Sequence, residues 1–497
     1  MGPLTPRARA HLLVAGVVGV ALTTQTLRQL WSSDVWQHAA SIGAFEAHPF
    51  DPNHPLSVGL VDDPYFLNPW GFVWGLFSRL TGLDVFSTLV VSGLVNMLLI
   101  GTGLYRLTTR LSAAPLAPAL AIVSLLLLWG PTPWRWSGYP NLNSIGFGLP
   151  YPSSFALALF LFGVAAAIDI ARGPSKPAII VMLTCVTLAV LSHALTGAAL
   201  ILSTVAITVA PPAYGSTARK RIVVVAGIVT VSVGLALLWP FGHLWDLAGA
   251  PAAFDDINRS VNRNLAGGAI CALLVAPLAL TRVASIGAWP LRAMFFANAT
   301  VAAVGFLGGP TSAGRFLPFA LLAVQLAFAD VLARSLERSD HRAAIGVAAA
   351  LLLAVGLVGS RGALARLIPS QVLTTTLEED DRLGRASRAA ARVPQIPVDD
   401  PVAIAGDGVD ARLLVANGVR VVSPPYPVAT LSERELARRA SDSDRFLSAS
   451  AGDQRAIRQR YDVDVLVVPH DTPSALQLGA LIASSPTMWV IDVSGLD

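Results

Sequence analysis

The sequence predicts an α-helical membrane bundle of about eleven transmembrane helices, followed by an extracytoplasmic α/β domain. Three observations lead to this fold class. First, 54% of the 497 residues are hydrophobic, 13% are charged and the mean hydropathy is +0.61, whereas a soluble chain carries about a quarter charged residues. Second, apolar runs of roughly 17–22 residues recur, the length that a bilayer core demands of a helix. Third, this character ends near residue 361, and residues 362–497 are rich in charges and turn signals.

Each apolar run is long enough to cross the bilayer once. The first run follows Arg7 and Arg9, as the apolar core of a signal peptide would. However, its core is long and no small-residue cleavage site follows it. We therefore expect a retained helix that also directs insertion. The Trp-rich stretch 69–83 is shorter, and we expect an interfacial or re-entrant helix there. The predicted spans are 10–28, 86–105, 113–130, 151–170, 177–192, 194–211, 222–240, 264–281, 293–309, 317–333 and 343–360.

Basic residues in the short loops orient the bundle. With the N-terminus inside, the inner loops carry fourteen arginines and lysines and the outer loops carry six. Because basic loops stay cytoplasmic, we expect a cytoplasmic N-terminus, a first outer loop at 29–85 and an outer C-terminal domain. Arginine greatly outnumbers lysine, which is typical of a GC-rich bacterial genome, so the expected location is the bacterial plasma membrane. The net charge of +4 follows from these loops and implies no nucleic-acid partner.

Two domains are therefore expected, a transmembrane domain at 1–361 and a soluble α/β domain at 362–497. Both cysteines, Cys185 and Cys271, lie in apolar runs, so the hydrophilic part has no disulfide framework and no cysteine-type zinc site. Its β-type runs are 402–406, 412–423, 464–469 and 488–493, and its helical runs are 432–450 and 453–461.

Asp34 lies a few residues after the first span, at the start of a predicted helix that runs to about Ala47. His38 is one turn further on and shares its face. Two interpretations are open: a capped interfacial helix with a local hydrogen bond, or a general base at the membrane surface that His38 orients.

Further along the same loop, His48, Asp51 and His54 form a proline-punctuated stretch that fits no common metal-ligand spacing, and we expect it to be solvated. Asp62 and Asp63 come before a proline. They form either a turn or a second acidic site that holds a divalent cation, Mg²⁺ or Mn²⁺, because hard cations prefer carboxylate oxygens.

The loop 131–150 places Arg135 between two tryptophans and adds Tyr139 and Asn141. An aromatic belt at the membrane interface explains these residues, and so does a sugar site in which rings stack on the sugar and amides contact hydroxyls. His193 lies in a short hairpin between two spans, where an ionisable group is a functional candidate.

Arg315, in GGPTSAGRFLPF, lies on the predicted outer side and breaks the positive-inside trend. A guanidinium there either snorkels to the interface or pairs with a phosphate. Arg259 and Arg263 are a weaker version of the same pattern. The candidate substrate-contacting residues are thus His38, Asp62, Asp63, Arg135, Tyr139, Asn141, His193 and Arg315.

Walker A, dinucleotide-binding, H-E-x-x-H and G-x-S-x-G motifs are absent from the sequence, so ATP-driven transport and dinucleotide chemistry have no support in it. An Asp just after the first span, a second acidic element in a long outer loop and GRFLPF before a late span together resemble the GT-C glycosyltransferases. The stretch 444–469, with Arg460, Tyr461, Asp462 and Asp464, is similar to the closing part of bacterial members.

This resemblance implies a membrane enzyme that uses a polyprenyl-phosphate-linked sugar as donor and a cell-envelope polysaccharide, glycolipid or protein as acceptor, in contact with membrane lipids. It implies that Asp34 is the catalytic Asp, that Asp62 and Asp63 match a metal site found in some members, and that Arg315 contacts the carrier phosphate. The expected reaction is a single displacement that inverts the anomeric carbon. The histidine-rich and proline-rich loop 48–55 departs from the family pattern.

Three alternatives remain. A secondary transporter has a similar number of spans, but it shows repeat symmetry between its halves, which this sequence lacks. A ligase or polymerase of surface polysaccharide has a long late outer loop instead of a C-terminal domain. A non-catalytic scaffold of the cell envelope would use the outer domain to bind its partners.

Overall fold

The computed structural model describes residues 4–31, 34–60, 63, 65–132, 136–209, 218–242, 258–259, 265–308, 310–338, 340–367, 386–428 and 430–496. The chain forms two compact units, and each is described by itself. One comprises Met1–Arg28, Val91–Leu238 and Asp255–Glu378, and is called the membrane unit. The other comprises Gln29–Val90, Trp239–Phe254 and Glu379–Asp497, and is called the α/β unit.

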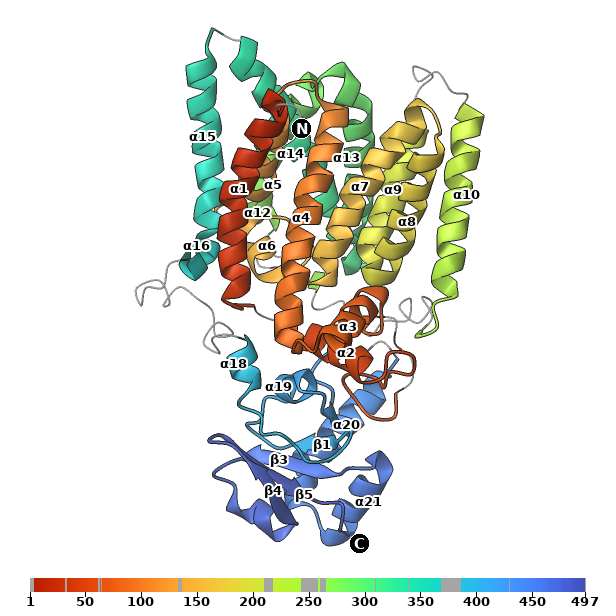
Figure 1. Cartoon of the computed structure of the whole chain (residues 1–497), viewed down its shortest axis with the longest axis vertical. Coiled ribbons are helices and arrows are strands. Elements are labelled where there is room, and N and C mark those ends of the chain that lie inside the picture. The colour runs from red at the N-terminus through yellow and green to blue at the C-terminus, as the bar shows by residue number, and fades with distance from the viewer. Residues whose placement is uncertain are drawn as a thin grey trace. The chain divides into compact units, whose positions relative to one another are not determined.

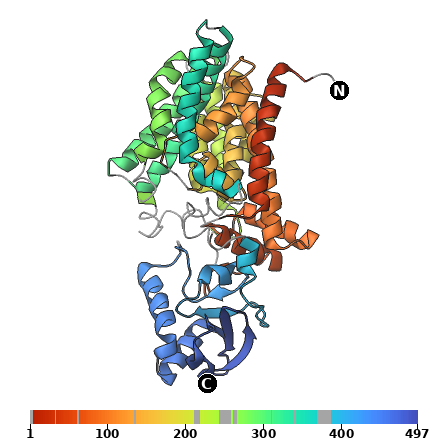
Figure 2. The same ribbon diagram turned by 90° about the vertical axis from the view of Figure 1, so that its left-hand side faces the viewer.

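The membrane unit is a bundle of long helices that run side by side (Figures 1 and 2). Its elements are α1 (Pro6–Leu27), most of α4 (Val85–Leu111), α5 (Ala117–Leu127), α6 (Leu142–Gly148), α7 (Pro152–Arg172), α8 (Lys176–Ser192), α9 (Ala194–Thr208), α10 (Ala218–Leu237), α12 (Leu265–Arg282), α13 (Ser285–Phe306), η2 (Thr311–Phe316), α14 (Leu317–Arg338), α15 (Arg342–Gly359) and α16 (Arg361–Leu367).

Each predicted span corresponds to one of these helices, which confirms a membrane helical bundle. Among the described residues, six helices are long and apolar enough to cross a membrane. Helix α7 and the continuous segment η2–α14 are 83% buried over their most apolar stretch, whereas α15 is 17% buried. A helix that is hydrophobic all round belongs in the centre of a bundle, so α7 and α14 form the core and α15 lies at its periphery.

Small residues allow close packing inside the bundle. A Cβ on Gly197 of α9 would come within 2.5 Å of the Val190 Cα in α8, and one on Gly163 of α7 would come within 2.8 Å of Leu200. Membrane helices gain stability from this kind of close backbone approach. The tight α8–α9 hairpin fixes the position of His193, the residue at its turn.

Two arginines near helix ends of this unit are paired with carboxylates. The Arg110 Nε donates to both carboxylate oxygens of Asp169 at 2.8 Å, which ties α4 to α7. Arg334 forms an ion pair of 2.8 Å with Asp330 in α14. The Asp330 carboxylate also accepts from the Ala284 N–H, before α13.

The α/β unit contains a five-stranded sheet with the strand order β2-β1-β3-β5-β4. Strand β1 pairs in parallel with β2 and β3, whereas β5 pairs antiparallel with β3 and β4. The elements are α2 (Val35–Ala47), α3 (Pro69–Thr81), α18 (Ala386–Ala390), β1 (Val402–Ala405), α19 (Ala411–Ala416), β2 (Arg420–Val421), α20 (Glu433–Arg445), η4 (Phe446–Ser448), α21 (Ala451–Tyr461), β3 (Val465–Pro469), η5 (Pro473–Gln477), β4 (Ala480–Ser484) and β5 (Met488–Asp492).

The predicted α/β character of the C-terminal segment is confirmed, with two local differences. Residues 412–423 do not form one strand: Asp410 caps α19 through the Arg412 N–H, and Gly418 at φ 79° then turns the chain into the short β2. Strand β4 was not predicted. It lies at the sheet edge and is largely exposed, so it lacks the apolar pattern of a core strand.

A segment of the predicted first outer loop joins this sheet at the β2 edge. The Val421 N–H donates to the Leu56 carbonyl at 3.1 Å, and the Ser57 hydroxyl donates to the Val421 carbonyl at 2.7 Å. Arg439 of α20 then donates to the Ser57 hydroxyl and to the Val58 carbonyl, both at 2.9 Å. The sheet and the loop that carries α2 and α3 therefore fold as one unit.

The motif around Arg460 and Tyr461 has a structural role here. The Tyr461 hydroxyl and the Arg460 guanidinium donate to the buried carboxylate of Asp442 in α20, at 2.9 and 2.8 Å. Asp462 ends α21 in a left-handed conformation, with φ 51°. The Asp464 carboxylate accepts from the Val402 N–H, which aligns β3 with β1. The motif thus joins α21 to α20 and begins the central strand.

Asp442→Asn is expected to lower the free energy of unfolding by about 2 kcal/mol at pH 7, because three charge-assisted or hydroxyl hydrogen bonds lose the charge of their acceptor. Burial favours the neutral acid, but hydrogen bonds from Tyr461, Arg445 and Arg460 outweigh it and lower the pKa of Asp442. The stabilisation is therefore complete above about pH 4 and is lost as the pH falls through the lowered value. Thermal unfolding against pH measures both effects. The exposed Asp444→Asn is the matched control on the same helix, and equal losses in the two variants would contradict the assignment.

Candidate active site

Asp34 immediately precedes α2, and its carboxylate does not cap that helix. The residue has φ −77° and ψ −3°, and its side chain makes no capping hydrogen bond. Its carbonyl accepts from the His38 N–H at 3.1 Å, as the first intrahelical bond. The predicted helix to Ala47 is therefore present, but Asp34 does not act in it as a side-chain cap.

His38 is held by an aromatic neighbour from α3. Its ring packs edge-to-face on Trp70, with the centroids 5.6 Å apart and an interplanar angle of 67°. Helix α3 is the short helix that the Trp-rich stretch predicts. It begins at Asn68, whose side chain accepts from the Gly71 N–H. At Gly75 the two helices approach so closely that a Cβ would lie 2.8 Å from the Ile42 carbonyl oxygen.

The loop after α2 contains a buried histidine–carboxylate pair. His48 and Asp51 are exposed, as expected, but the expectation for His54 was wrong, because it is only 3% exposed. Its Nδ1 accepts from the Leu56 and Ser57 N–H groups. A neutral ring then carries its proton on Nε2, which lies 3.8 Å from the Asp63 carboxylate. The sequence offered no signal for this pairing.

Asp63, one half of the predicted acidic pair, already has protein partners. Asp63 is fully buried; its Oδ1 accepts from the Tyr65 N–H at 2.9 Å and its Oδ2 faces the His54 ring. Hard cations need several oxygen ligands, and the described part of the chain contains no group of three or more His, Cys, Asp or Glu side chains suited to a metal. Asp62 lies outside the described residues, as does Arg135.

In the membrane unit, the structure brings together Arg315, Tyr139 and His193, which are far apart in the sequence. The Arg315 guanidinium donates to the Ser137 carbonyl at 2.8 Å and lies over the Tyr139 ring, 5.6 Å from its centroid. Both side chains lie near Gly138: a Cβ there would be 3.7 Å from Arg315 Nη2 and 4.0 Å from His193 Cε1.

Two packing arrangements position Arg315 and His193. Arg315 lies in η2, which packs so tightly on α13 that a Cβ on Gly305 would lie 2.7 Å from the Gly314 N. His193 is held at the α8–α9 turn, where its Nδ1 accepts from the Thr196 N–H and contacts the Thr196 hydroxyl at 2.8 Å. In the sequence, only the three-residue spacing between His193 and Thr196 indicates that the histidine caps α9.

The cluster is cationic, and the described residues place no carboxylate partner on Arg315. Among the described residues, Arg315 makes one hydrogen bond and no ion pair. Burial, followed by the charge of Arg315, lowers the pKa of His193 to about 3, so the ring is neutral at pH 7. Burial raises the pKa of Tyr139 to about 12, against the effect of Arg315. A neutral histidine whose Nδ1 is an acceptor presents an Nε2–H donor.

Asn141 lies next to the cluster in sequence but has a role in the fold. It caps α6, with its Oδ1 accepting from the Ser144 N–H at 2.8 Å, and it is 3% exposed. Trp70 and His54 were not predicted as site residues, and only the Trp-rich composition of 69–83 pointed to the former. The substrate-contacting roles of all these residues stay predictions.

Comparison with known proteins shows the fold. The cryo-EM structure of a mutant of the arabinofuranosyltransferase AftD from Mycobacteria is similar over 99% of this chain and 42% of its own, with a TM-score of 0.60 at 15% identity. The crystal structure of ArnT from Cupriavidus metallidurans bound to undecaprenyl phosphate is similar over 98% of both chains, with a TM-score of 0.53 at 14% identity. No protein-family model and no curated protein matches the chain.

The chain therefore has the same fold as these two glycosyltransferase structures, which is the fold that the resemblance found in the sequence implies. It is a multi-pass membrane protein with a small C-terminal sheet. It spans about two fifths of the length of AftD and nearly all of ArnT.

The neutral state of His193 makes stability depend on pH. The folded chain holds this ring unprotonated, whereas the unfolded chain takes up a proton below about pH 6.5. Stability should therefore fall as the pH drops from 6.5 towards 3, by at most about 1.4 kcal/mol per pH unit. In His193→Gln this contribution is absent, so its unfolding temperature should change less between pH 7 and pH 4. Parallel pH curves for the wild type and this variant would contradict the assignment.

Proposed function

We propose that this protein is a membrane glycosyltransferase that moves a sugar from a polyprenyl-phosphate carrier to a polysaccharide, glycolipid or protein of the bacterial cell envelope. The fold supports the class, and the related ArnT structure contains undecaprenyl phosphate. In this proposal the N-terminus is cytoplasmic, the C-terminal domain beyond residue 361 is extracytoplasmic, and the reaction takes place on the outer face of the plasma membrane. No sugar nucleotide is needed there.

The observation that carries the proposal is the cationic cluster of the membrane unit. A charge inside a membrane protein is normally paired, because desolvation makes an isolated ion costly. Arg110 and Arg334 have carboxylate partners at 2.8 Å, whereas Arg315 contacts a carbonyl and an aromatic ring among the described residues. A guanidinium has five N–H donors. An anionic ligand such as the carrier phosphate would supply the missing charge.

His193 complements this arrangement. Its ring is neutral, so it neither repels Arg315 nor adds charge, and its Nε2–H is a donor. A phosphate oxygen accepts from both groups. Arg315 would supply the positive charge, and the Nε2–H of His193 would supply a directional hydrogen bond. This combination suits recognition of a phosphate monoester or diester.

Asp34 is proposed as the general base. Its carboxylate does not cap α2, and it lies one turn before His38, which packs on Trp70. Asp34 takes the proton from an acceptor hydroxyl as that oxygen attacks the anomeric carbon. The new carbon–oxygen bond forms as the bond from the anomeric carbon to the phosphate oxygen breaks. Polyprenyl phosphate leaves with the bonding electrons, and the configuration inverts. None of these steps routes through a metal ion.

Asp34→Asn should lower kcat by about 10²–10⁴-fold, because the amide cannot accept the proton, while the KM for the donor stays unchanged. The assay follows transfer from polyprenyl-phosphate-linked arabinose and mannose to envelope fractions, with the protein in proteoliposomes. Asp51→Asn, an exposed carboxylate of the same loop, is the matched control and should keep wild-type rates. Full transfer by Asp34→Asn would refute the assignment. Wild-type protein that moves no sugar at all would instead favour a transporter or a scaffold.

Arg315→Gln should raise the KM for the lipid-linked donor about 10–100-fold, because one charge-assisted contact with phosphate contributes about 1.5–3 kcal/mol. Arg315→Lys keeps the charge and should recover part of the loss. Arg338→Gln, which removes an exposed guanidinium from the last turn of α14, is the control. An unchanged donor KM in Arg315→Gln would exclude the phosphate role.

A further inference from the structure

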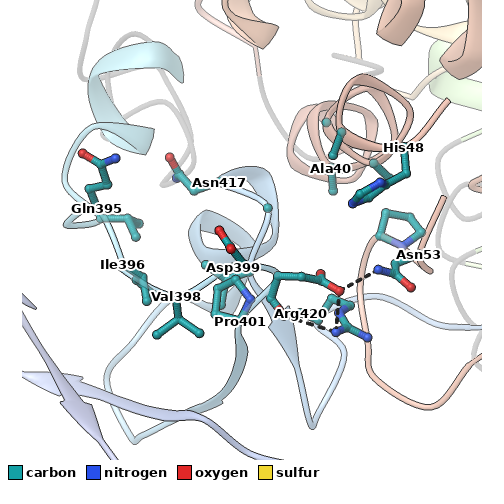
Figure 3. Close-up of a pocket in the computed structure, with 18 of the residues that line it drawn as sticks. Ala40, His48, Asn53, Gln395, Ile396, Val398, Asp399, Pro401, Asn417 and Arg420 are labelled. Carbon is teal, nitrogen blue, oxygen red and sulfur yellow. Dashed lines mark hydrogen bonds and ion pairs between the residues drawn. The ribbon is translucent and has the colours of Figure 1, made fainter. Parts of the chain in front are cut away.

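The α/β unit contains a cavity of about 670 Å³ that has no part in the mechanism above. Two segments distant in sequence form its walls. One wall is helix α2 and the loop that follows it, and the other is the stretch 393–401 together with 417–420. Figure 3 shows Ala40 of α2 and His48, which follows this helix, opposite Gln395, Asp399 and Asn417 from the C-terminal segment.

The cavity lies on a different face of α2 from the proposed base. Ala40, Gly43, Ala44 and Ala47 line it, and at about 3.6 residues per turn they form a single stripe. Asp34, His38, Ser41 and Phe45 form another stripe, and Ser41 and Phe45 contact α3 at Gly71 and Gly75. A ligand in the cavity is therefore separate from Asp34.

One edge of the cavity is held in an unusual conformation. Asp400 has φ 50°, a left-handed value that is rare for a residue other than glycine. Its carboxylate accepts from Asn53 at 2.6 Å and from Arg420 at 2.7 Å (Figure 3). The Arg420 Nε is buried and has no hydrogen-bond partner among the described residues. A strained residue and an unsatisfied buried donor together are typical of a binding site.

The lining indicates the chemistry of the ligand. Gln395, Asp399 and His48 are exposed polar groups, and the Asn417 amide donates to the Ala390 and Leu413 carbonyls, which leaves its carbonyl oxygen for a ligand. Apolar side chains such as Ile396 and Val398 lie between them. Among the described lining residues, the arginine present is Arg420, which is paired with Asp400, and Asp399 adds negative charge, so an anionic ligand is disfavoured. A neutral compound with many hydroxyl groups fits both kinds of surface and the volume.

We propose that this cavity is an accessory binding site for a neutral glycan chain, which holds the acceptor polysaccharide away from the transfer reaction. The choice of a glycan rests on the proposed function. Amides and carboxylates would bind the hydroxyl groups of one or two sugar rings, while the α2 stripe and the apolar side chains contact their C–H faces. Such a site would keep a polymeric acceptor at the enzyme between reactions.

Gly43→Leu tests the site directly. Gly43 lines the cavity and a Cβ there meets no atom within 4 Å, so a leucine should extend into the cavity. Leucine also favours the helix more than glycine does. Gly452→Leu makes the same exchange in α21, where the nearest atom is a serine hydroxyl at 3.9 Å, and is the matched control. Asp399→Ala removes an exposed polar group of the lining without filling the cavity.

Binding is measured by calorimetry on the full-length protein in detergent, with neutral arabinan, mannan and glucan hexasaccharides as probes. The wild type and Gly452→Leu should bind at least one of them equally. Gly43→Leu should bind it at least tenfold more weakly, with an unfolding temperature no lower than that of the wild type, and Asp399→Ala should bind it more weakly than the wild type.

No binding of any probe by the wild type, or unchanged binding by Gly43→Leu, would overturn the inference. Transfer of sugar from the lipid carrier is measured separately on the same preparations. If the wild type transfers sugar but Gly43→Leu binds the probe normally, the cavity inference fails and the proposed function stands. If the wild type binds a probe that Gly43→Leu loses, yet transfers nothing, the binding site stands and the proposed function fails.

Discussion

The α/β unit depends on the contact between the first-loop segment and the edge of the sheet. The Leu56 carbonyl and the Ser57 hydroxyl bond to Val421, and Arg439 fixes Ser57 from α20. These partners are separated by more than 360 residues of chain. The entropy lost in closing a loop grows only slowly with its length, so a few buried hydrogen bonds and a shared core hold the segment in place. One face of helix α2 thereby packs on α3, and another face lines the cavity.

The membrane unit shows a different constraint, the neutralisation of charge. Its helix ends carry Arg110 and Arg334, each paired with a carboxylate within 2.8 Å. Arg315 is held as firmly, by a carbonyl and by the Tyr139 ring, but these partners stabilise the cation without neutralising it. The fold thus retains a positive charge beside a neutral histidine. The proposed contact with the carrier phosphate rests on this charge.

Many features of the fold could be predicted because their causes are local. A span is recognised from about twenty apolar residues, since the thickness of the bilayer sets the length. The helix over 35–47 follows from periodicity, and those over 433–445 and 451–461 follow from periodicity and the capping residues Ser432 and Ser450. Prediction was wrong where the local signal was weak or fitted a helix and a strand equally well. Residues 412–423 contain one apolar run that a single Gly418 divides into helix and strand, and His54 gave no sign of the buried carboxylate that it faces.

The sequence by itself determined the fold class, the order of the spans, the α/β character of the C-terminal segment, and the residue types on which the chemistry depends. Only the tertiary structure decided which of those residues meet. It places Arg315 beside Tyr139 and His193, turns Asn141 into a helix cap, and forms a cavity between α2 and residues 393–420. The physical reason is that composition and periodicity reflect neighbours along the chain. Contacts between residues hundreds of positions apart depend on which helices and strands pack together. Periodicity shows which face of an element is packed but does not identify its partner.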